Sequence, residues 1–352
     1  MQRTALFSIH QRLGARMVEF AGWEMPLNYG SQIEEHHIVR RSAGIFDVSH
    51  MMVTEIKGSE AQSYLRKLLV NDVIKLDQPG RALYSCMLNE NGGIIDDLIV
   101  YFLEDNHYRI VSNAGTREKV SQWLNQSSDN FDVQITPSND QSIIAFQGPE
   151  ARGLLSQVLD QVADKIDDLQ SFHSFQWHDL FIACTGYTGE DGFEIIIPSA
   201  SVISFWEQLI RAGAKPVGLG ARDSLRLEAG MNLYGTDMDE ETTPLETGLT
   251  WTVAWQPEDR EFIGRAALEN QKKTGISRKQ VGLLLGEKGI FRAHQQIFIG
   301  DRQVGEITSG GFSPTLGKSI ALACVESAVK GEVEVQIRKK RLPAVIVQPP
   351  FI

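Results

Sequence analysis

The chain has 352 residues, of which 42% are hydrophobic and 22% are charged, and this composition is typical of a folded protein with two or three domains. Its formal net charge of −11 argues against nucleic acid or an anionic membrane surface as the main partner. No apolar run approaches the length of a membrane span, and the three scattered cysteines include no Cys-x-x-Cys pair, so we expect a protein of a reducing compartment, the cytoplasm.

Helices and strands alternate irregularly over the first 230 residues. The range 33–42 is expected to be a helix, because acids occupy its first turn and bases its last. Its His36-His37 pair lacks the spacing of helical metal ligands, so a solvated face is expected there. Apolar spacing predicts further helices at 58–70, 117–124, 151–158, 202–212 and 221–230. Strands are expected at 82–88, 93–102, 108–112, 142–146, 181–184 and 193–197. This interleaving is typical of an α+β protein rather than a strict βαβ series.

The predicted secondary structure changes near residues 270–280, where a domain boundary is expected. The charged range 258–279 is expected to be helical in part. Short strands broken by Gly and Pro are then expected at 281–285, 296–299, 304–308, 320–325 and 333–337. Such a run is typical of a small antiparallel barrel or sandwich.

Two adjacent carboxylates, Asp96 and Asp97, lie inside the run GGIIDDLIVY (92–101), which otherwise has the composition of a fully buried strand. Burying a carboxylate is costly unless hydrogen bonds or a charge compensate. Neighbouring side chains on a strand point to opposite faces, so the two acids are not a pair sharing one proton. We therefore expect one of them to face a ligand that carries N–H groups, and the other to have a backbone or arginine partner.

The segment TGYTGEDGFEI (185–195) has three glycines in seven residues, which allow the backbone to approach a ligand or another strand closely. Tyr187 offers a flat face for stacking. Glu194 enters an apolar strand, so its carboxylate is either partly buried or an exposed hairpin acid, and the sequence favours neither. On the predicted helix at 221–230, Arg222 and Arg226 share a face, where they either bind a carboxylate or form ion pairs within the helix.

The ranges 17–27 and 46–51 are rich in aromatic residues and Met, which usually indicates core. A P-loop, an HExxH motif, a GxSxG motif and a complete dinucleotide fingerprint are all missing. Together, the embedded acids, the arginine and the aromatic residues suit a flat heteroaromatic ligand with N–H donors and a carboxylate. A reduced pterin with a glutamate tail fits this description, and we expect no metal site.

Over nearly its whole length the chain resembles the glycine cleavage T-protein family, the folate-dependent aminomethyltransferases. The motifs that carry the resemblance follow one another in the family's order: FAGWEMPLNY (20–29), FDVSHM (46–51), GGIIDDLIVY (92–101), TGYTGEDGFEI (185–195), GLGARDSLRLEAGMNLYG (218–235), FIGR (262–265) and EITSGGFSPTLG (306–317).

This resemblance implies an α+β fold of three domains arranged as a cloverleaf around a central folate pocket, with a C-terminal antiparallel β barrel. The implied first domain is discontinuous and α+β, and it comprises residues 1–50 and 138–250. The second α+β domain comprises residues 51–137. A connecting segment at 251–275 leads to the barrel at 276–352.

The resemblance also implies transfer of a methylene unit from the aminomethyl-dihydrolipoyl arm of an H-protein to tetrahydrofolate, which is a co-substrate, with no metal. Asp96 matches the family's essential aspartate near the reacting folate nitrogens. Glu194 matches the acid that binds the amino and N–H edge of the pterin, and Arg222 matches a binding-site arginine beside it. Further residues match the walls of the pterin pocket: Asn113, Tyr84, Met51 and Tyr187.

The implied partners are the lipoylated H-protein carrier and the other glycine cleavage proteins. Neither nucleic acid nor a membrane is expected as a partner. The basic run 338–341 is a candidate docking patch, although a solvated turn is the more common role for such a run. Folate-dependent demethylases and the folate domains of dimethylglycine and sarcosine oxidising enzymes share the aspartate strand. A related folate-binding branch that aids iron–sulfur assembly carries a Lys-Gly-Cys-Tyr-type motif, and this chain has no cysteine there. A scaffold protein without a ligand is the alternative from a different class.

Overall fold

The structure, a computed structural model, describes residues 1–352. It contains two compact units, each assembled from separate stretches of the chain. Unit 1 comprises residues 1–64, 73–83 and 98–223, and unit 2 comprises residues 65–72, 84–97 and 224–352. The predicted α+β class with a C-terminal antiparallel barrel is confirmed. No helix has both the length and the apolar character needed to cross a membrane.

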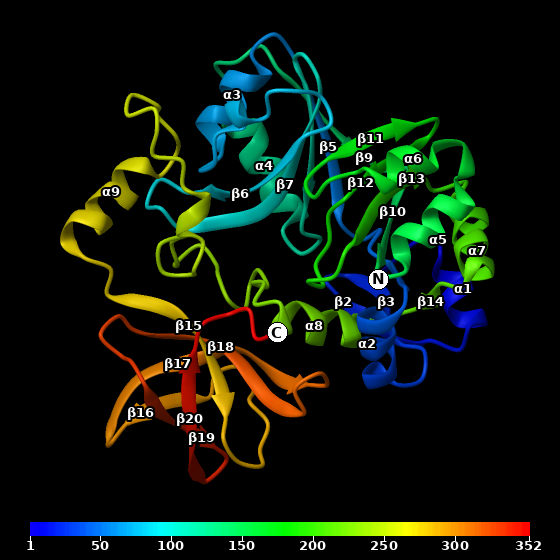
Figure 1. Ribbon diagram of the computed structural model, residues 1–352. Helices are drawn as coiled ribbons and strands as arrows, with labels where there is room; N and C mark the ends of the chain where they lie inside the picture. The colour runs from blue at the N-terminus through cyan, green and yellow to red at the C-terminus, as the bar shows by residue number, and fades with distance from the viewer. The chain divides into compact units, whose positions relative to one another are not determined.

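Unit 1 is built on a six-stranded sheet with the order β11-β12-β13-β10-β4-β14. Its strands are β11 (Ser174–Trp177), β12 (Leu180–Ala183), β13 (Gly192–Pro198), β10 (Gln141–Gln147), β4 (Gly44–Asp47) and β14 (Lys215–Pro216). The helices α5 (Ala151–Val158) and α7 (Val202–Ala212) pack on one another, and α5 packs on β13 (Figure 1). Their apolar faces and the sheet enclose a core that includes Phe146, Phe193 and Trp206.

The remaining elements of unit 1 are shorter. The strands β1 (Gln2–Arg3), β3 (Trp23–Asn28) and β2 (Arg16–Phe20) form a small sheet. Unit 1 also contains four further helices: α1 (Phe7–Arg12), α2 (Gln32–Arg41), α4 (Arg117–Gln126) and α6 (Ala163–Asp167). It has 3₁₀ turns at Val73–Lys75 and Asp160–Val162.

A five-stranded sheet has the order β6-β7-β8-β5-β9, and two of its strands carry residues of both units. Its strands are β6 (Ala82–Leu88), β7 (Ile94–Glu104), β8 (His107–Ser112), β5 (Met52–Lys57) and β9 (Gln134–Ser138). Within unit 1, β7 and β8 are antiparallel with Leu98 opposite Ser112. The helix α3 (Ala61–Leu68) also carries residues of both units, and its leucines, Leu65 and Leu68, are buried.

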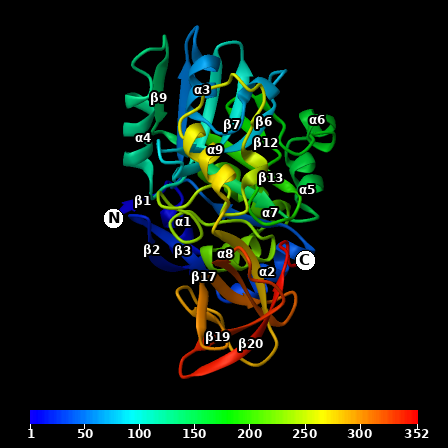
Figure 2. The ribbon, with the colours of Figure 1, turned by 90° about the vertical axis from the view of Figure 1, so that its left-hand side faces the viewer.

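Unit 2 contains a closed antiparallel barrel with the order β15-β18-β17-β16-β19-β20, drawn from orange to red in Figure 2. Its strands are β15 (Arg278–Leu285), β18 (Lys318–Glu326), β17 (Arg302–Ser313), β16 (Gln296–Ile299), β19 (Glu332–Ile337) and β20 (Lys340–Val347). The last of these was not predicted. The helices α8 (Leu219–Glu228), which begins in unit 1, and α9 (Arg265–Thr274) precede the barrel, as does the 3₁₀ turn at Thr250–Thr252.

Polar side chains attach the end of α8 to the barrel within unit 2. The buried Arg226 guanidinium lies 2.9 Å from an oxygen of the buried Asp237 carboxylate and donates to the Ser309 hydroxyl at 2.8 Å. The buried Glu228 carboxylate accepts hydrogen bonds from the hydroxyls of Ser313 and Thr315. The segment 306–317 therefore supplies side chains that attach the barrel to α8, and Arg226 is an ion-pairing residue.

One expectation about α2 is wrong. His36 has no exposed surface, so the His36-His37 pair does not lie on a solvated face. The buried face of α2 also carries Glu35, whose carboxylate accepts hydrogen bonds from the backbone N–H groups of Tyr29 and Gly218. Because backbone groups from elsewhere satisfy the acid, the polar sequence of α2 concealed its buried face.

In unit 2, Arg260 fastens the loop that follows α3. Its guanidinium is almost fully buried and donates to five backbone carbonyl oxygens, those of Arg66, Leu69, Val70, Asn71 and Ala254. Asp72 pairs with it at 3.5 Å and lies 2.9 Å from Arg66. Burial lowers the pKa of Arg260 to about 10, but the group stays charged at neutral pH.

We predict that Arg260→Met destabilises the protein by about 3 kcal/mol or more, because several buried carbonyl oxygens lose their donor together. Arg302→Met is the matched control. Arg302 pairs with Glu326 at the surface, with 66% of its side chain exposed, and its loss should cost about 0.5 kcal/mol or less. Urea unfolding of both variants measures the difference, and equal stability of the two would refute the assigned role of Arg260.

Candidate functional site

The two adjacent carboxylates lie on β7 and differ in exposure. Asp96 has no exposed surface, whereas Asp97 is partly exposed. The same alternation continues along the strand, with Leu98 buried and Ile99 partly exposed, as expected for side chains that point to opposite faces. Both acids act electrostatically on the buried Cys86 thiol, whose pKa is raised, mainly by burial and further by their charges.

In unit 2, Asp97 accepts a hydrogen bond of 2.9 Å from the hydroxyl of Tyr84 on β6. This contact supplies a partner of a kind that the sequence did not predict. The Tyr84 ring stacks on Trp251, with ring centroids 5.7 Å apart, and 65% of Trp251 is exposed. Asn71 holds this part of β6 by donating to the Tyr84 carbonyl oxygen at 3.0 Å. Tyr84 therefore supports the aspartate strand and also presents an aromatic face, and Trp251 and Asn71 were missed.

In unit 1, Glu194 lies on β13 and is 7% exposed, so the exposed-hairpin alternative is wrong. Its carboxylate accepts a 2.7 Å hydrogen bond from the Thr185 hydroxyl, which is 3.1 Å from the hydroxyl of Tyr101. Burial and the Glu194 charge raise the pKa of Tyr101, so the phenol stays protonated. Glu194 is thus a buried carboxylate held by a hydroxyl rather than by a close salt bridge.

The glycine-rich loop at 185–192 is fixed by the buried side chain of Gln147. The Gln147 amide donates to the Thr185 carbonyl oxygen at 3.1 Å, and its oxygen accepts from the Thr188 hydroxyl at 2.7 Å. A Cβ at Gly186 would lie 1.9 Å from the Gln147 side-chain oxygen, so only glycine fits there. The loop thereby holds Tyr187 in place.

Arg222, on α8, lies over the Tyr187 ring with its guanidinium carbon 4.7 Å from the ring centroid. The residue as a whole is partly exposed, but its Nη1 atom is wholly buried and has no hydrogen-bond partner. Burial lowers the pKa of Arg222, while the Glu194 charge opposes that shift. Glu194 and Tyr187, from one predicted motif, and Arg222, from another, therefore form one cluster in unit 1.

The predicted residues Met51 and Asn113 flank the ends of two paired strands. Met52 on β5 lies opposite Ser112 on β8, which brings the residues just beyond them to the same edge. Arg117 donates to the carbonyl oxygens of His50 and Met51 at 3.2 and 3.3 Å. The turn that carries Met51 is thereby held by the first residue of α4.

Asp47 holds the same turn from the other side. Its buried carboxylate accepts from the Thr4 hydroxyl at 2.6 Å and from the Ser49 N–H at 2.9 Å, and it lies 2.9 Å from His10 Nε2. Burial alone would raise the pKa of Asp47, but the contacts with His10, Ser49 and Thr4 outweigh it and lower the pKa. Asp47 is therefore a charged support for the sequence FDVSHM.

His50 and Arg117 were not among the predicted site residues. His50 is 4% exposed, and neither its Nδ1 atom nor the buried Nε atom of Arg117 has a hydrogen-bond partner. Buried polar atoms without a partner are uncommon in native proteins, so these two nitrogen atoms are donors that a bound group could use. The Met and aromatic content of 46–51 predicted core, and that pattern does not reveal this property of His50.

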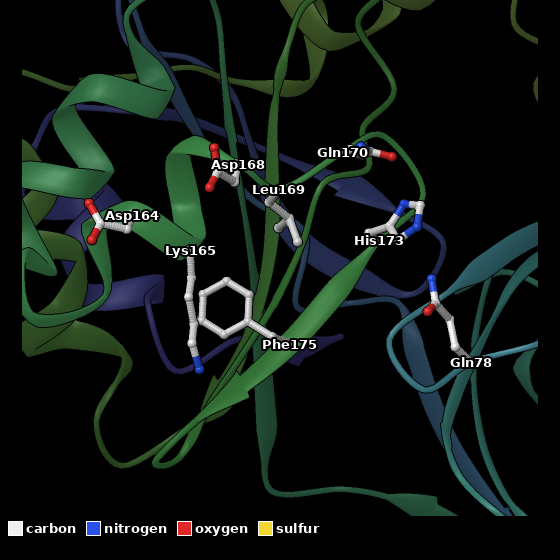
Figure 3. A pocket seen from close by; sticks show the side chains of 8 residues that line it. All are labelled: Gln78, Asp164, Lys165, Asp168, Leu169, Gln170, His173 and Phe175. Carbon is white, nitrogen blue, oxygen red and sulfur yellow. The ribbon is translucent and has the colours of Figure 1, made fainter.

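A separate surface hollow of about 550 Å³ lies beside α6 and β11 in unit 1. Figure 3 shows its lining side chains: Gln78, Asp164, Lys165, Asp168, Leu169, Gln170, His173 and Phe175. None of the predicted site residues is among them. No group of His, Cys, Asp or Glu side chains is arranged to hold a metal ion.

Within unit 1, the cluster combines an acceptor (Glu194), a cation with an unused donor (Arg222) and an aromatic face (Tyr187). This set can bind a flat ligand that has N–H donors on one edge and an acceptor nearby. Within unit 2, Asp96 offers a buried carboxylate beside a second acid, which suits a group that carries or develops positive charge.

Two family models match the chain. The N-terminal domain of the glycine cleavage T-protein matches residues 6–257, and the C-terminal barrel domain of the same protein matches residues 278–352.

Similar proteins cover nearly the whole chain. An aminomethyltransferase of Methylococcus capsulatus is 54% identical over 99% of this chain and 96% of its own. One of Alcanivorax borkumensis is 55% identical over the same shares. The crystal structure of the glycine cleavage system aminomethyltransferase T from Bartonella henselae superimposes with a TM-score of 0.94 at 35% identity, covering 100% of this chain and 98% of that one. The chain therefore belongs to the glycine cleavage T-protein family, the aminomethyltransferases of the glycine cleavage system.

Proposed function

We propose that the one-carbon acceptor of this aminomethyltransferase is tetrahydrofolate and that the donor is the aminomethyl-dihydrolipoyl arm of an H-protein. The observation that carries the proposal is the unit 1 cluster, where a buried acid and an arginine with an unused donor lie at an aromatic face. A reduced pterin has the complementary edge of N–H donors and a carbonyl acceptor.

In the proposed reaction the carbon of the S–CH2–NH2 group forms bonds to two folate nitrogens, while its bonds to sulfur and to the amine nitrogen break. The two protons lost by the folate nitrogens pass to the amine and to the thiolate. The products are 5,10-methylenetetrahydrofolate, ammonia and the dihydrolipoyl H-protein, with no change of oxidation state.

Asp96 is proposed to orient the folate N–H groups and to stabilise the positive charge that develops on nitrogen and carbon during transfer. Its complete burial supports this role, because a charge acts more strongly where water is excluded. Holding the nucleophilic nitrogen against the aminomethyl carbon adds a proximity effect, worth roughly 7–11 kcal/mol at best. Asp97 is proposed to keep the strand in place.

In unit 1, Glu194 is proposed to accept hydrogen bonds from the 2-amino and ring N–H groups of the pterin. Arg222 is proposed to lie beside it, and Tyr187, Met51 and Asn113 to form walls. Tyr84 is proposed as a further wall residue, and no metal takes part. We also propose a cytoplasmic location, in keeping with three cysteines that form no disulfide.

One assay tests the proposed function. The protein is incubated with aminomethyl-lipoylated H-protein and tetrahydrofolate, and methylenetetrahydrofolate and ammonia are measured. We expect both products in equal amounts, and none of the folate product with dimethylglycine or sarcosine as donor. Turnover of these small donors in place of the H-protein would instead indicate a folate-dependent demethylase.

We predict that Glu194→Gln weakens tetrahydrofolate binding by about 10- to 100-fold, because the pterin N–H groups lose a charged acceptor. Saturating folate should recover most of the turnover. Intrinsic tryptophan fluorescence measures the dissociation constant, with Glu332→Gln, an exposed acid of β19, as the control that keeps it. An unchanged constant for Glu194→Gln would remove Glu194 from the pterin site.

The H-protein is proposed to approach the exposed turn between β19 and β20, where Arg338, Lys339 and Lys340 are exposed. Arg341 is less available, because its guanidinium donates to the Gly300 carbonyl oxygen and lies 3.9 Å from the Phe298 ring centroid. The turn therefore presents a compact positive patch on the barrel.

Reversing the charge of the three exposed residues to Glu is predicted to weaken the apparent affinity for H-protein by about tenfold at low ionic strength, and less at high salt. The tetrahydrofolate dissociation constant should stay the same. Kinetic titration with H-protein checks this, and an unchanged apparent affinity would dismiss the patch.

A further inference from the structure

Six buried side-chain nitrogen atoms of unit 1 lack any hydrogen-bond partner, and three of them, His50 Nδ1, Arg117 Nε and Arg222 Nη1, belong to residues that act on one another. These three come from three separate elements, namely the turn after β4, the start of α4 and the start of α8. Leaving one such atom unpaired costs roughly 1–3 kcal/mol. Three together in one neighbourhood therefore point to a ligand group that accepts hydrogen bonds.

Electrostatics and direct contacts place the three residues in one neighbourhood. The charges of Arg222 and Arg117 both act on His50, and Arg117 also donates to the His50 carbonyl oxygen at 3.2 Å. On its apolar side the imidazole meets the Phe20 ring edge to face, with centroids 5.5 Å apart.

His50 is neutral in this setting. Burial, chiefly, and the charges of Arg222 and Arg117 lower the pKa of His50 to about 4, although Asp47 acts in the opposite direction. A neutral imidazole carries one proton, and the nitrogen without a protein partner is free to hold it toward a ligand. At neutral pH the three residues therefore offer hydrogen-bond donors with only two full charges among them.

Arg117 is fixed well enough to act as part of a site. One guanidinium nitrogen donates to two carbonyl oxygens of the turn 50–51, and the guanidinium carbon lies 5.9 Å from the Trp23 ring centroid. With these contacts made, its Nε–H remains the unused donor. Burial lowers the pKa of Arg117, which stays a cation.

We propose that His50, Arg117 and Arg222 form the part of the pterin site that donates hydrogen bonds to the 4-oxo group of the folate, directly or through a water bound to that oxygen. The inference rests on the proposed function. Glu194 would bind the N–H edge of the ring, and these three residues would bind the neighbouring carbonyl oxygen. His50 and Arg117 then become specificity-determining residues.

The chemistry of the ring makes the proposal selective. A 4-oxo pterin presents an acceptor at position 4 and a donor at the adjacent ring nitrogen. A 4-amino pterin reverses both, so that its amino group would face three donors and leave them unsatisfied. A site built to bond one group rejects the analogue that lacks it, because its own buried polar atoms stay unpaired.

The test compares the dissociation constants of tetrahydrofolate and of 4-amino-4-deoxytetrahydrofolate. We expect the native protein to prefer the 4-oxo ligand by about tenfold or more. His50→Phe, which keeps a flat ring but removes the donor, should lower this preference by about tenfold. His50→Asn places an amide nitrogen near the position of Nδ1 and should restore the preference to within about threefold of the native value.

Arg117→Met, which keeps the apolar stem beside Trp23, should also lower the preference. His173→Phe, in the surface hollow of Figure 3, is the matched control and should leave the preference unchanged. Thermal unfolding of each variant separates loss of fold from loss of preference.

The outcomes distinguish failure of the proposed function from failure of the role proposed for His50. Absence of tetrahydrofolate binding by the native protein would overturn the proposed function and this inference with it. Normal binding, with an equal loss for both ligands in His50→Phe, would overturn the inference alone and make His50 a packing residue. The same holds if His50→Asn and His50→Phe keep the native preference.

Discussion

The structure depends on the high cost of burying a charged or polar group without a partner. This chain buries many such groups, and most of them are compensated within the fold. Arg260 donates to five carbonyl oxygens, Arg226 pairs with Asp237, and Asp47 receives hydrogen bonds from Thr4 and Ser49. These residues join loops and helices to sheets, and their full set of partners identifies them as supports.

A second set of buried groups is compensated only in part, and it includes three residues of the proposed site. Arg222, His50 and Arg117 each keep a buried nitrogen without a partner. Glu194 lies in the same unit, and its carboxylate accepts a hydrogen bond from the Thr185 hydroxyl. In the proposed site, a ligand that completes these contacts would recover the free energy that the unpartnered groups cost, which is how a preorganised site gains affinity.

The sequence predicted the parts of the fold that local patterning controls. The boundaries of α5, α7, β6 and β16 match the expected ranges, because apolar period and turn residues act over short distances. Strand β20 was not predicted because Arg341 and Pro343 interrupt its apolar pattern. The burial of His36 was not predicted because α2 has a polar sequence, and its neighbour Glu35 is buried with a remote backbone N–H group, that of Gly218, as partner. Long-range compensation of this kind leaves no periodic signal.

For the candidate site, alternation along β7 was enough to separate Asp96 from Asp97, and the structure gives them different exposure. Burial of Glu194 could be named only as one of two alternatives, because it is set by pairing with β10 and β12. His50 and Arg117 were invisible in the sequence, since a histidine in an aromatic stretch is usually part of the core. Only the missing partners of their nitrogen atoms distinguish them.

The central claim is that β7 carries one catalytic acid and one supporting acid, and a paired substitution tests it most directly. Asp96→Asn and Asp97→Asn change one atom each on adjacent residues of the same strand, and turnover is measured with aminomethyl-lipoylated H-protein and tetrahydrofolate. The account predicts a loss of about 100-fold or more for Asp96→Asn with the fold retained, and turnover within about threefold of native for Asp97→Asn, since its amide oxygen can still accept from Tyr84. Equal losses in the two variants, or near-native turnover in Asp96→Asn, would contradict it.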